Sequence, residues 1–362
     1  MKRTEAIIIT VVFCLALIVP PAATLLTPNR TFSEWENRDL AQAPSPTAKT
    51  VFSGEFGKDF ESWLTDQFFA RDFWVKFKRS VDNALLIKES NGVIVGENAL
   101  FDIPSEIDEK AVEKNVNAIN AFVKNTALPT SVMLIPSPAS LFPDELPFLA
   151  PIPKEKETVN SIYSKLEGVE LVDAATPLSQ MESDDAFYKT DHHWTSRGAS
   201  EVYSSWRGGE FEFETVSEDF FGTLTSRSGD TGTDADTIEK IVSGERYSCS
   251  VFNGISTIEN DSMYFDEYLE KKDKYSYFLG TNEPLVTLER EGDGKTLLIF
   301  KDSFAHSFVQ CCAEDYNRVI LVDLRYVTSP VATLVDLSLV DEVLFLYSVE
   351  NFTTQDNMMW IK

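Results

Sequence analysis

Apolar runs alternate with amphipathic segments in two parts of this chain. Five apolar runs predict buried strands, at 131–135, 169–173, 295–300, 318–323 and 342–348. Apolar residues at helical spacing predict helices at 109–125, 154–166 and 303–313. Continuous apolar strands separated by helices are typical of a parallel sheet with helices on both faces. The pattern therefore predicts an α/β fold.

The alternation stops between about 207 and 294. This stretch is rich in Gly, Thr, Ser and Asp, as in FGTLTSRSGDTGTDAD. Long segments of this kind inside a domain are often functional. We expect an inserted region of loops and short strands that can cover a site, within a domain that runs from 55 to 362.

The first 27 residues form a separate hydrophobic segment, in which Lys2 and Arg3 precede an apolar run from Ala6 to about Leu26. The run has signal-peptide length up to Val19, and read to Leu26 it is long enough to span a bilayer. A signal anchor and a cleaved signal peptide both stay open. Both predict that the rest of the chain is extracytoplasmic, either membrane-anchored or secreted.

Two segments of different character follow. Residues 28–54 are polar and rich in Pro and Ser, which predicts an extended linker. Residues 55–88 carry aromatic side chains near helical spacing, such as Phe60, Phe73 and Phe77. We interpret this aromatic stripe as core packing between two helices.

Composition and short motifs exclude several classes of function. The net charge of −26 would repel phosphate backbones, so nucleic acid is not an expected partner. No CxxC pair and no phosphate-binding GxxxxGK[ST] motif occurs, so neither a cysteine-ligated metal site nor a cofactor is predicted. Four cysteines are present, and a disulfide between Cys249 and either Cys311 or Cys312 stays open.

Polar residues at two places are the first candidates for chemistry. Ligands of open α/β sheets bind beyond the carboxyl ends of the strands. Ser303 follows a strand and begins a helix, where first-turn N–H groups near Phe304 can stabilise an oxyanion, although an ordinary helix cap is the alternative. The loop FYKTDHHWTSRGA supplies Asp191 and His193, the carboxylate and imidazole that a nucleophilic serine needs.

Two other interpretations of this loop stay open. Its histidines can be loop residues that hydrogen-bond locally, or Asp191, His192, His193 and His306 can bind a metal ion. Adjacent histidines in extended backbone point to opposite sides, which disfavours one metal site formed by both.

Other strand ends add candidate contacts to a substrate. Asn351 follows the last strand and can donate to an oxyanion or stabilise a turn. Arg325 and Tyr326 follow the strand at 318–323, where they can shape a substrate groove or form a surface ion pair.

The letters DHHW name a protein family, and the chain resembles that family over nearly its whole exported length. Further matching segments, in family order, are SEWENRDLAQAPSP, FGKDFESWLTDQFFARDFW, NGVIVGENALF, LIPSPASLFPDELP, LLIFKDSFAHSF and EVLFLYSVENF. The DHHW family is in turn similar to the alginate O-acetyltransferases and, more remotely, to the SGNH (GDSL) hydrolases.

The resemblance implies an SGNH hydrolase-like parallel sheet in which the Asp-x-His motif precedes the serine motif, a permuted order. It implies a triad of Asp191, His193 and Ser303, with His192 at the x position and not the base. Because adjacent residues of extended backbone point to opposite sides, we expect His192 to face away from His193 and to support the loop or rim the substrate groove. Lys301 departs from the glycine that is usual before Asp-Ser in these relatives.

The resemblance also implies an activity. We expect an extracytoplasmic, serine-dependent O-acetyltransferase or acetylesterase that acts on a cell-envelope or exported polysaccharide. The expected partners are a carbohydrate acceptor, an acyl donor that the sequence does not identify, and a membrane acyltransferase. The alternatives are a non-catalytic carbohydrate-binding or envelope-assembly protein that keeps the fold, and a metal-dependent hydrolase.

Overall fold

The computed structural model describes residues 3–33, 38–85, 87–243, 247–313 and 315–361. Lys2 and part of the SEWENRDLAQAPSP segment lie outside these residues. The chain forms two compact units, one of residues 1–87 with 226–230 and the other of residues 88–225 with 231–362. The predicted domain boundary at residues 54 and 55 stays a prediction.

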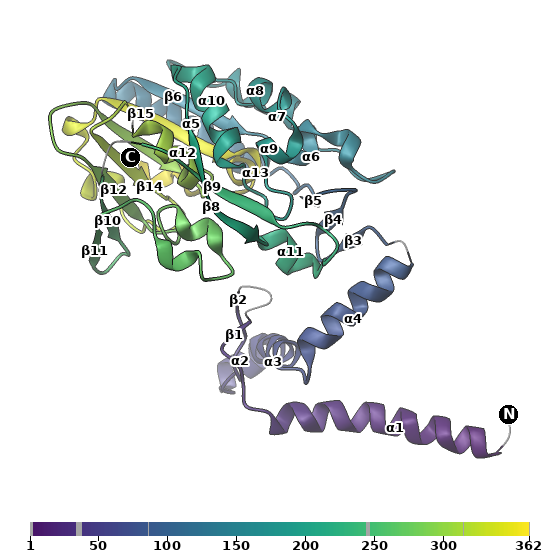
Figure 1. The fold of residues 1–362 in the computed structure, drawn as a ribbon. Coiled ribbons are helices and arrows are strands. Elements are labelled where there is room, and N and C mark those ends of the chain that lie inside the picture. Colours follow the sequence, from purple (N-terminus) through teal and green to yellow (C-terminus); the bar gives the residue numbers. More distant parts are fainter. Residues whose placement is uncertain (1–2, 34–37, 86, 244–246, 314, 362) are drawn as a thin grey trace. The chain divides into compact units, whose positions relative to one another are not determined.

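The first unit is mainly helical (Figure 1). Its elements are α1 (Arg3–Leu26), β1 (Phe32–Ser33), β2 (Arg38–Asp39), α2 (Ala48–Ser53), α3 (Glu55–Asp66) and α4 (Arg71–Ala84). By length and composition, α1 is able to cross a membrane. The predicted linker thus contains three short elements. One of them, α2, begins there because Thr47 and Thr50 form a capping box.

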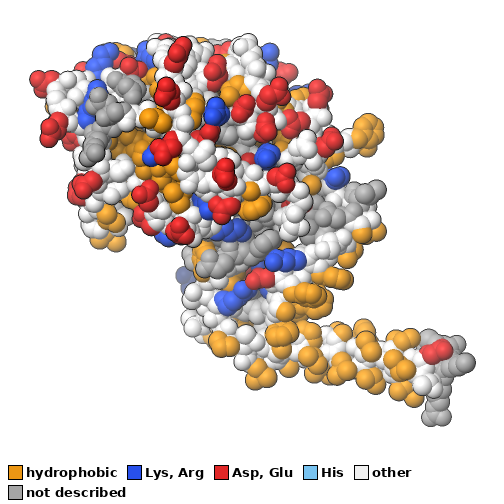
Figure 2. Space-filling model, in the orientation of Figure 1, with side chains coloured by type: hydrophobic (Ala, Val, Ile, Leu, Met, Phe, Trp, Pro, Cys, Tyr) orange, Lys and Arg blue, Asp and Glu red, His pale blue; other side chains and the backbone are white. Residues whose placement is uncertain are grey.

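The aromatic stripe of α3 and α4 does not form the predicted core between two helices. Trp63 is buried, but Phe73, Trp74 and Phe77 are 59%, 44% and 52% exposed. The Phe73 and Phe77 rings stack at 6.1 Å between centroids along one side of α4. Figure 2 shows apolar side chains exposed along α1 and α4. Helical spacing identifies a face of a helix, but it does not reveal what covers that face.

An eight-stranded mixed sheet forms the centre of the second unit (Figure 1), in the order β11-β10-β12-β14-β13-β15-β6-β7. Its strands are β6 (Thr130–Ile135), β7 (Glu170–Val172), β10 (Ser248–Phe252), β11 (Thr257–Asn260), β12 (Leu285–Glu289), β13 (Thr296–Lys301), β14 (Arg318–Val322) and β15 (Glu342–Ser348). The five strands from β14 to β7 run parallel, while β12, β10 and β11 pair antiparallel. The predicted α/β class with a mostly parallel sheet is confirmed.

Helices cover both faces of this sheet. On one face, α10 (Ser196–Arg207) and α12 (Ala305–Cys312) share a core with Leu297 and Ile299 of β13. On the other face, α5 (Glu109–Thr126), α7 (Glu155–Tyr163) and α13 (Val349–Thr354) share a core with Leu298 and Phe300. Because side chains alternate along a strand, one apolar run supplies both cores.

The region from 207 to 294 forms the predicted loops and short strands, but three of its strands belong to the main sheet. It contributes β10, β11 and β12 to the main sheet, and β8 (Phe213–Phe220) pairs with β9 (Asp236–Ile241) as a separate ribbon. The remaining helices and strands are β3 (Glu89–Ser90), β4 (Val93–Val95), β5 (Leu100–Asp102), α6 (Pro138–Leu141), α8 (Ala175–Ser179), α9 (Ser183–Ala186) and α11 (Thr223–Ser228). Cys249, Cys311 and Cys312 are buried free thiols, so neither disulfide left open by the sequence is formed.

Candidate active site

Ser303 lies just beyond the carboxyl end of β13, and its Oγ is 2.7 Å from Nε2 of His193. Nδ1 of the same ring is 2.5 Å from Oδ1 of Asp191. All three residues are buried, with Ser303 the most exposed at 8%. In such a chain the imidazole can accept the serine proton, while the carboxylate fixes the tautomer and orientation of the ring.

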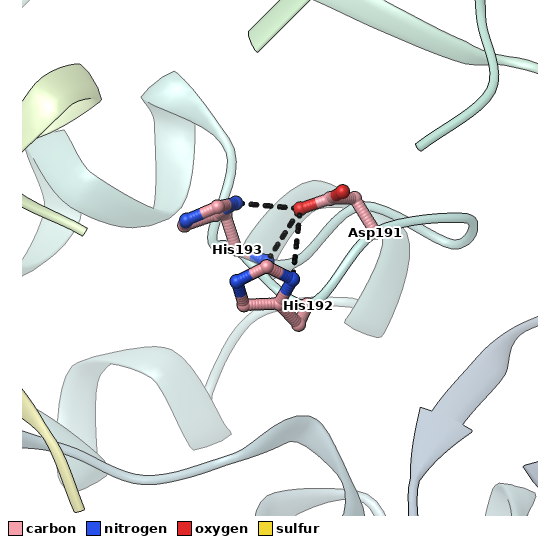
Figure 3. Close-up of side chains that lie close together, drawn as sticks. All are labelled: Asp191, His192 and His193. Atoms are coloured by element: carbon pink, nitrogen blue, oxygen red, sulfur yellow. Dashed lines mark hydrogen bonds and ion pairs between the residues drawn. The ribbon is translucent and has the colours of Figure 1, made fainter. Parts of the chain in front are cut away.

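The DHHW loop is a series of bends that hold both histidine rings on one side of Asp191 (Figure 3). The His193 N–H donates to Oδ1 of Asp191 at 3.1 Å, and the Tyr188 N–H donates to the His193 carbonyl. The His192 ring lies 3.9 Å from the His193 ring, with Nδ1 3.5 Å from Oδ1 of Asp191. The expectation that His192 faces away is wrong, because the opposite-sides rule applies to extended backbone.

Gly222, which precedes α11, and Thr223, the first residue of α11, hold Asp191 in place. The Thr223 N–H donates to Oδ2 of Asp191 at 2.7 Å. A Cβ added to Gly222 would lie 2.4 Å from the Cβ of Asp191, so glycine is required for this close approach. Neither residue was predicted from the sequence, since one Gly-Thr pair does not stand out in a region rich in both residues.

Tyr275, which lies in the region predicted as an insertion, stacks its ring on the face of the His193 imidazole. Its ring lies 3.9 Å from the His193 ring at an interplanar angle of 9°. Its hydroxyl donates to the Ser303 carbonyl at 3.0 Å, so one side chain contacts both members of the Ser–His pair. Trp194 is fully buried and donates to the Phe304 carbonyl at 2.9 Å, which anchors the DHHW loop next to α12.

Electrostatics favour the catalytically useful protonation states. Burial opposes the charge of Asp191, but His192, His193 and the Thr223 amide outweigh it and lower the pKa of Asp191. Burial and, second, the neighbouring His192 lower the pKa of His193 to about 4, against the opposing effect of Asp191. At neutral pH, Asp191 is therefore charged and His193 is neutral, which is the form of a general base.

Asp302 binds two of the residues predicted to stabilise an oxyanion. Its Oδ1 accepts the Phe304 N–H at 3.0 Å, and its Oδ2 accepts Nδ2 of Asn351 at 2.8 Å. Oδ2 also accepts the backbone N–H and the hydroxyl of Ser348, each at 2.8 Å. This fully buried carboxylate therefore joins the turn that carries Ser303 to the start of α13, and it holds Asn351 next to that turn.

Comparison with known proteins identifies the fold around this site. Residues 105–205, which include Asp191 and His193, match the family model described as SGNH hydrolase-like domain, acetyltransferase AlgX. A DHHW family protein from Eubacterium siraeum aligns with a TM-score of 0.64 at 20% identity, over 74% of this chain and 94% of that chain. The chain has an SGNH hydrolase-like fold. PatB1 of Bacillus cereus, solved with a sulfonyl adduct, aligns with a TM-score of 0.62 at 19% identity, over 75% of this chain and 98% of that chain.

The family resemblance inferred from the sequence motifs is thus confirmed at the level of the fold. No curated protein sequence matches the chain. At such low identities the two solved structures support the SGNH hydrolase-like fold alone, so the chemistry has to be argued from this chain's own residues.

Lys301 forms an ionic cluster two residues before Ser303 in this SGNH hydrolase-like fold. Its fully buried Nζ lies 3.2 Å from Oδ2 of Asp323, 3.2 Å from Oδ1 of Asn282 and 2.8 Å from Nε2 of His306. Burial lowers the pKa of Lys301, and Asp323 opposes that effect. Because Nδ1 of His306 faces the Phe278 carbonyl, both ring nitrogens of this third histidine are engaged away from the triad.

Arg325 and Tyr326, the candidate substrate contacts that follow β14, have different surroundings. Arg325 binds both oxygens of Asp323, with Nε at 2.8 Å and Nη2 at 2.6 Å. The Arg325 guanidinium therefore completes the buried ion cluster. Tyr326 is 47% exposed, so it remains a candidate for a substrate contact.

A metal ion would have to compete with the hydrogen bonds of the triad. Asp191, His192 and His193 offer ligand atoms within 4.8 Å of one another. Both nitrogens of His193 already contact Asp191 and Ser303, and His306 belongs to the Lys301 cluster. The arrangement therefore fits a serine mechanism better than the metal site considered from the sequence.

Proposed function

We propose that this chain is an extracytoplasmic, serine-dependent O-acetyltransferase or acetylesterase that acts on a cell-envelope or exported polysaccharide. The observation that carries the proposal is the hydrogen-bonded chain of Ser303, His193 and Asp191, with distances of 2.7 and 2.5 Å. The family model for residues 105–205, whose description names an acetyltransferase, supports the same reaction class. The apolar helix α1 supports export, and we propose that it is retained as a signal anchor.

The proposed reaction has two halves. His193 Nε2 takes the proton of Ser303 as Oγ forms a bond to the acyl carbon of a donor ester. The oxyanion collapses, the donor alkoxide leaves with the proton from His193, and an acyl-serine remains. A sugar hydroxyl then gives its proton to His193 and attacks the acyl-serine. The bond from the acyl carbon to Oγ breaks, the new ester forms, and His193 returns the proton to Oγ, which restores Ser303. Water in place of the sugar gives hydrolysis.

Asn351 is our proposed oxyanion donor. An amide nitrogen carries two hydrogens, so Nδ2 can donate one to Asp302 and the other to the developing oxyanion. The Phe304 N–H has one hydrogen, which Asp302 already accepts. An Asn351→Ala variant is therefore expected to lower kcat by about 10²-fold, the usual effect of losing one such donor.

Covalent labelling tests the nucleophile. An arylsulfonyl fluoride should transfer its sulfonyl group to Oγ of Ser303 with release of fluoride, as the sulfonyl adduct of PatB1 suggests. Mass spectrometry should find the mass gain on the Ser303 peptide and not in Ser303→Ala. The matched control is Ser307→Ala, since Ser307 also contacts the Tyr275 hydroxyl but lies outside the proposed reaction path. Aryl acetate hydrolysis that survives in Ser303→Ala would refute the serine mechanism.

Offering the enzyme carbohydrate acceptors distinguishes acetyl transfer from ester hydrolysis. The net charge of −26 favours a neutral or cationic acceptor over a polyanion. With an aryl acetate as donor, we expect acetyl ester on an N-acetylglucosamine oligomer and less on a uronate oligomer. Acetate alone as the product would identify an esterase, and carbohydrate binding without turnover would favour the non-catalytic alternative.

A further inference from the structure

The exposed aromatic side of α4 calls for an explanation. Phe69 precedes the helix, and Phe73, Phe77 and Val81 follow at intervals of four residues, with Trp74 beside them. Each of these five side chains is at least 39% exposed. Residues four apart share one side of a helix, so Phe73, Phe77 and Val81, with Trp74 beside them, form a continuous surface, the α4 aromatic face, and Phe69 lies just before it.

Direct contacts tie the start of α4 to the end of α1. The Thr24 hydroxyl near the end of α1 accepts the Phe69 N–H at 2.9 Å, and Thr24 is only 2% exposed. Arg30 pairs with Asp72 in the first turn of α4 at 2.9 Å. Within this unit the α4 aromatic face therefore begins where the apolar helix ends.

Charge and side-chain type both match a lipid surface. Helix α4 carries four basic and two acidic residues, a net charge of +2 in a chain whose net charge is −26. Tryptophan is enriched where proteins meet the boundary between lipid tails and headgroups, and phenylalanine is common on the apolar side of helices that lie there. An amphipathic helix with a cationic polar side and an aromatic apolar side is typical of helices that lie in the plane of a bilayer surface.

We propose that the α4 aromatic face lies in the anionic surface of the same bilayer that α1 crosses. This inference rests on the proposed location of the chain, with α1 retained as an anchor. Helix α4 then has two links to the membrane, the covalent connection to α1 and its own apolar face. The net positive charge of α4 adds attraction to anionic headgroups, although Lys78 is paired with Asp82 within the helix.

Spin labels on the full-length chain in phosphatidylglycerol vesicles test the proposal. Cys14→Ser serves as background, because the other three cysteines are buried and should not react with the label. The single substitutions Phe73→Cys and Phe77→Cys probe the α4 aromatic face. Ile9→Cys, at an exposed residue of α1, and Glu113→Cys, at an exposed residue of α5, are the lipid and water references. Relaxation by oxygen, which concentrates in lipid, is compared with relaxation by a water-soluble nickel chelate.

We expect labels at 73 and 77 to resemble the Ile9 label and to be relaxed more by oxygen than by nickel, whereas the Glu113 label shows the reverse. Replacing phosphatidylglycerol by phosphatidylcholine should raise nickel accessibility at 73 and 77 and leave the Ile9 label unchanged. Nickel-accessible labels at 73 and 77 in anionic vesicles would overturn the inference.

Labels shielded from both reagents would also overturn it, because protein would then cover the face, either a second copy or the α/β unit. An Ile9 label exposed to water would refute the proposed location together with the inference. None of these readouts depends on acyl transfer, so the proposed activity can fail or succeed separately. Circular dichroism of each labelled chain verifies that it is folded.

Discussion

The acid limit of activity is the sharpest test of the proposed base. The reaction requires neutral His193, so activity should fall as the pH drops through the pKa of this residue in the folded enzyme. Burial lowers that pKa from 6.5 to about 4, with His192 as the second cause. A shift of this size corresponds to a penalty of about 3 kcal/mol against the charged ring. We therefore expect kcat/KM for an aryl acetate to keep its plateau well below pH 6.

The His192→Gln variant tests the cause of this shift. Glutamine keeps a polar side chain in the DHHW loop but cannot become positively charged. The substitution therefore removes the titratable ring that lies 3.9 Å from the His193 ring. The acid limb of kcat/KM should move to higher pH, while the plateau above pH 7 changes little. Ser303→Ala provides the background rate at each pH. Because the sequence pI is about 4.5, enzyme exposed to acid should also be returned to pH 7 and assayed for recovery.

Two results would refute this reasoning. A wild-type acid limb near pH 6.5 would mean that burial does not depress the pKa of His193. An acid limb that does not move in His192→Gln would mean that the neighbouring ring contributes nothing measurable. The first result would mean that His193 behaves as an ordinary imidazole. The second would mean that the electrostatic role assigned to His192 is wrong, while burial could still account for the lowered pKa of His193.

Three substitutions around the triad give further predictions. Gly222→Ala places a methyl group 2.4 Å from the Cβ of Asp191, so kcat should fall by about 10³-fold in a chain with native circular dichroism, and wild-type activity would disprove the close approach. Tyr275→Phe loses the bond to the Ser303 carbonyl but keeps the ring on His193, so it should lose about 1 kcal/mol of stability in urea unfolding and retain more activity than Tyr275→Ala. Lys301→Met removes one partner of Asp323 but leaves its pair with Arg325, so the free energy of unfolding should fall by about 1–3 kcal/mol. A variant more stable than wild type would mean that the buried Lys301 destabilises the fold.

The sheet could be predicted from the sequence because its signal is local. The apolar runs at 131–135 and 342–348 correspond to β6 and β15 almost residue for residue, since a strand buried on both faces needs a continuous apolar sequence. The helix after β13 was predicted to begin at Ser303, but α12 begins at Ala305. Asp302 accepts the Phe304 N–H and turns the chain there, so Ser303 lies on a turn before the helix.

The parts that could not be predicted depend on contacts between distant segments. Gly222, Thr223 and Tyr275 come from a region without periodicity, and their importance arises because that region folds back onto the DHHW loop. The aromatic stripe of α4 is the reverse case. Its helical periodicity was clear in the sequence, but the surface that covers it was predicted to be another helix of the protein. A hydrophobic pattern specifies which side of a helix avoids water, and both a protein core and a bilayer satisfy that requirement. Only the surroundings of the α4 aromatic face distinguish a protein core from a bilayer. Here the features that favour a bilayer are the connection of α4 to α1 and the positive charge of α4.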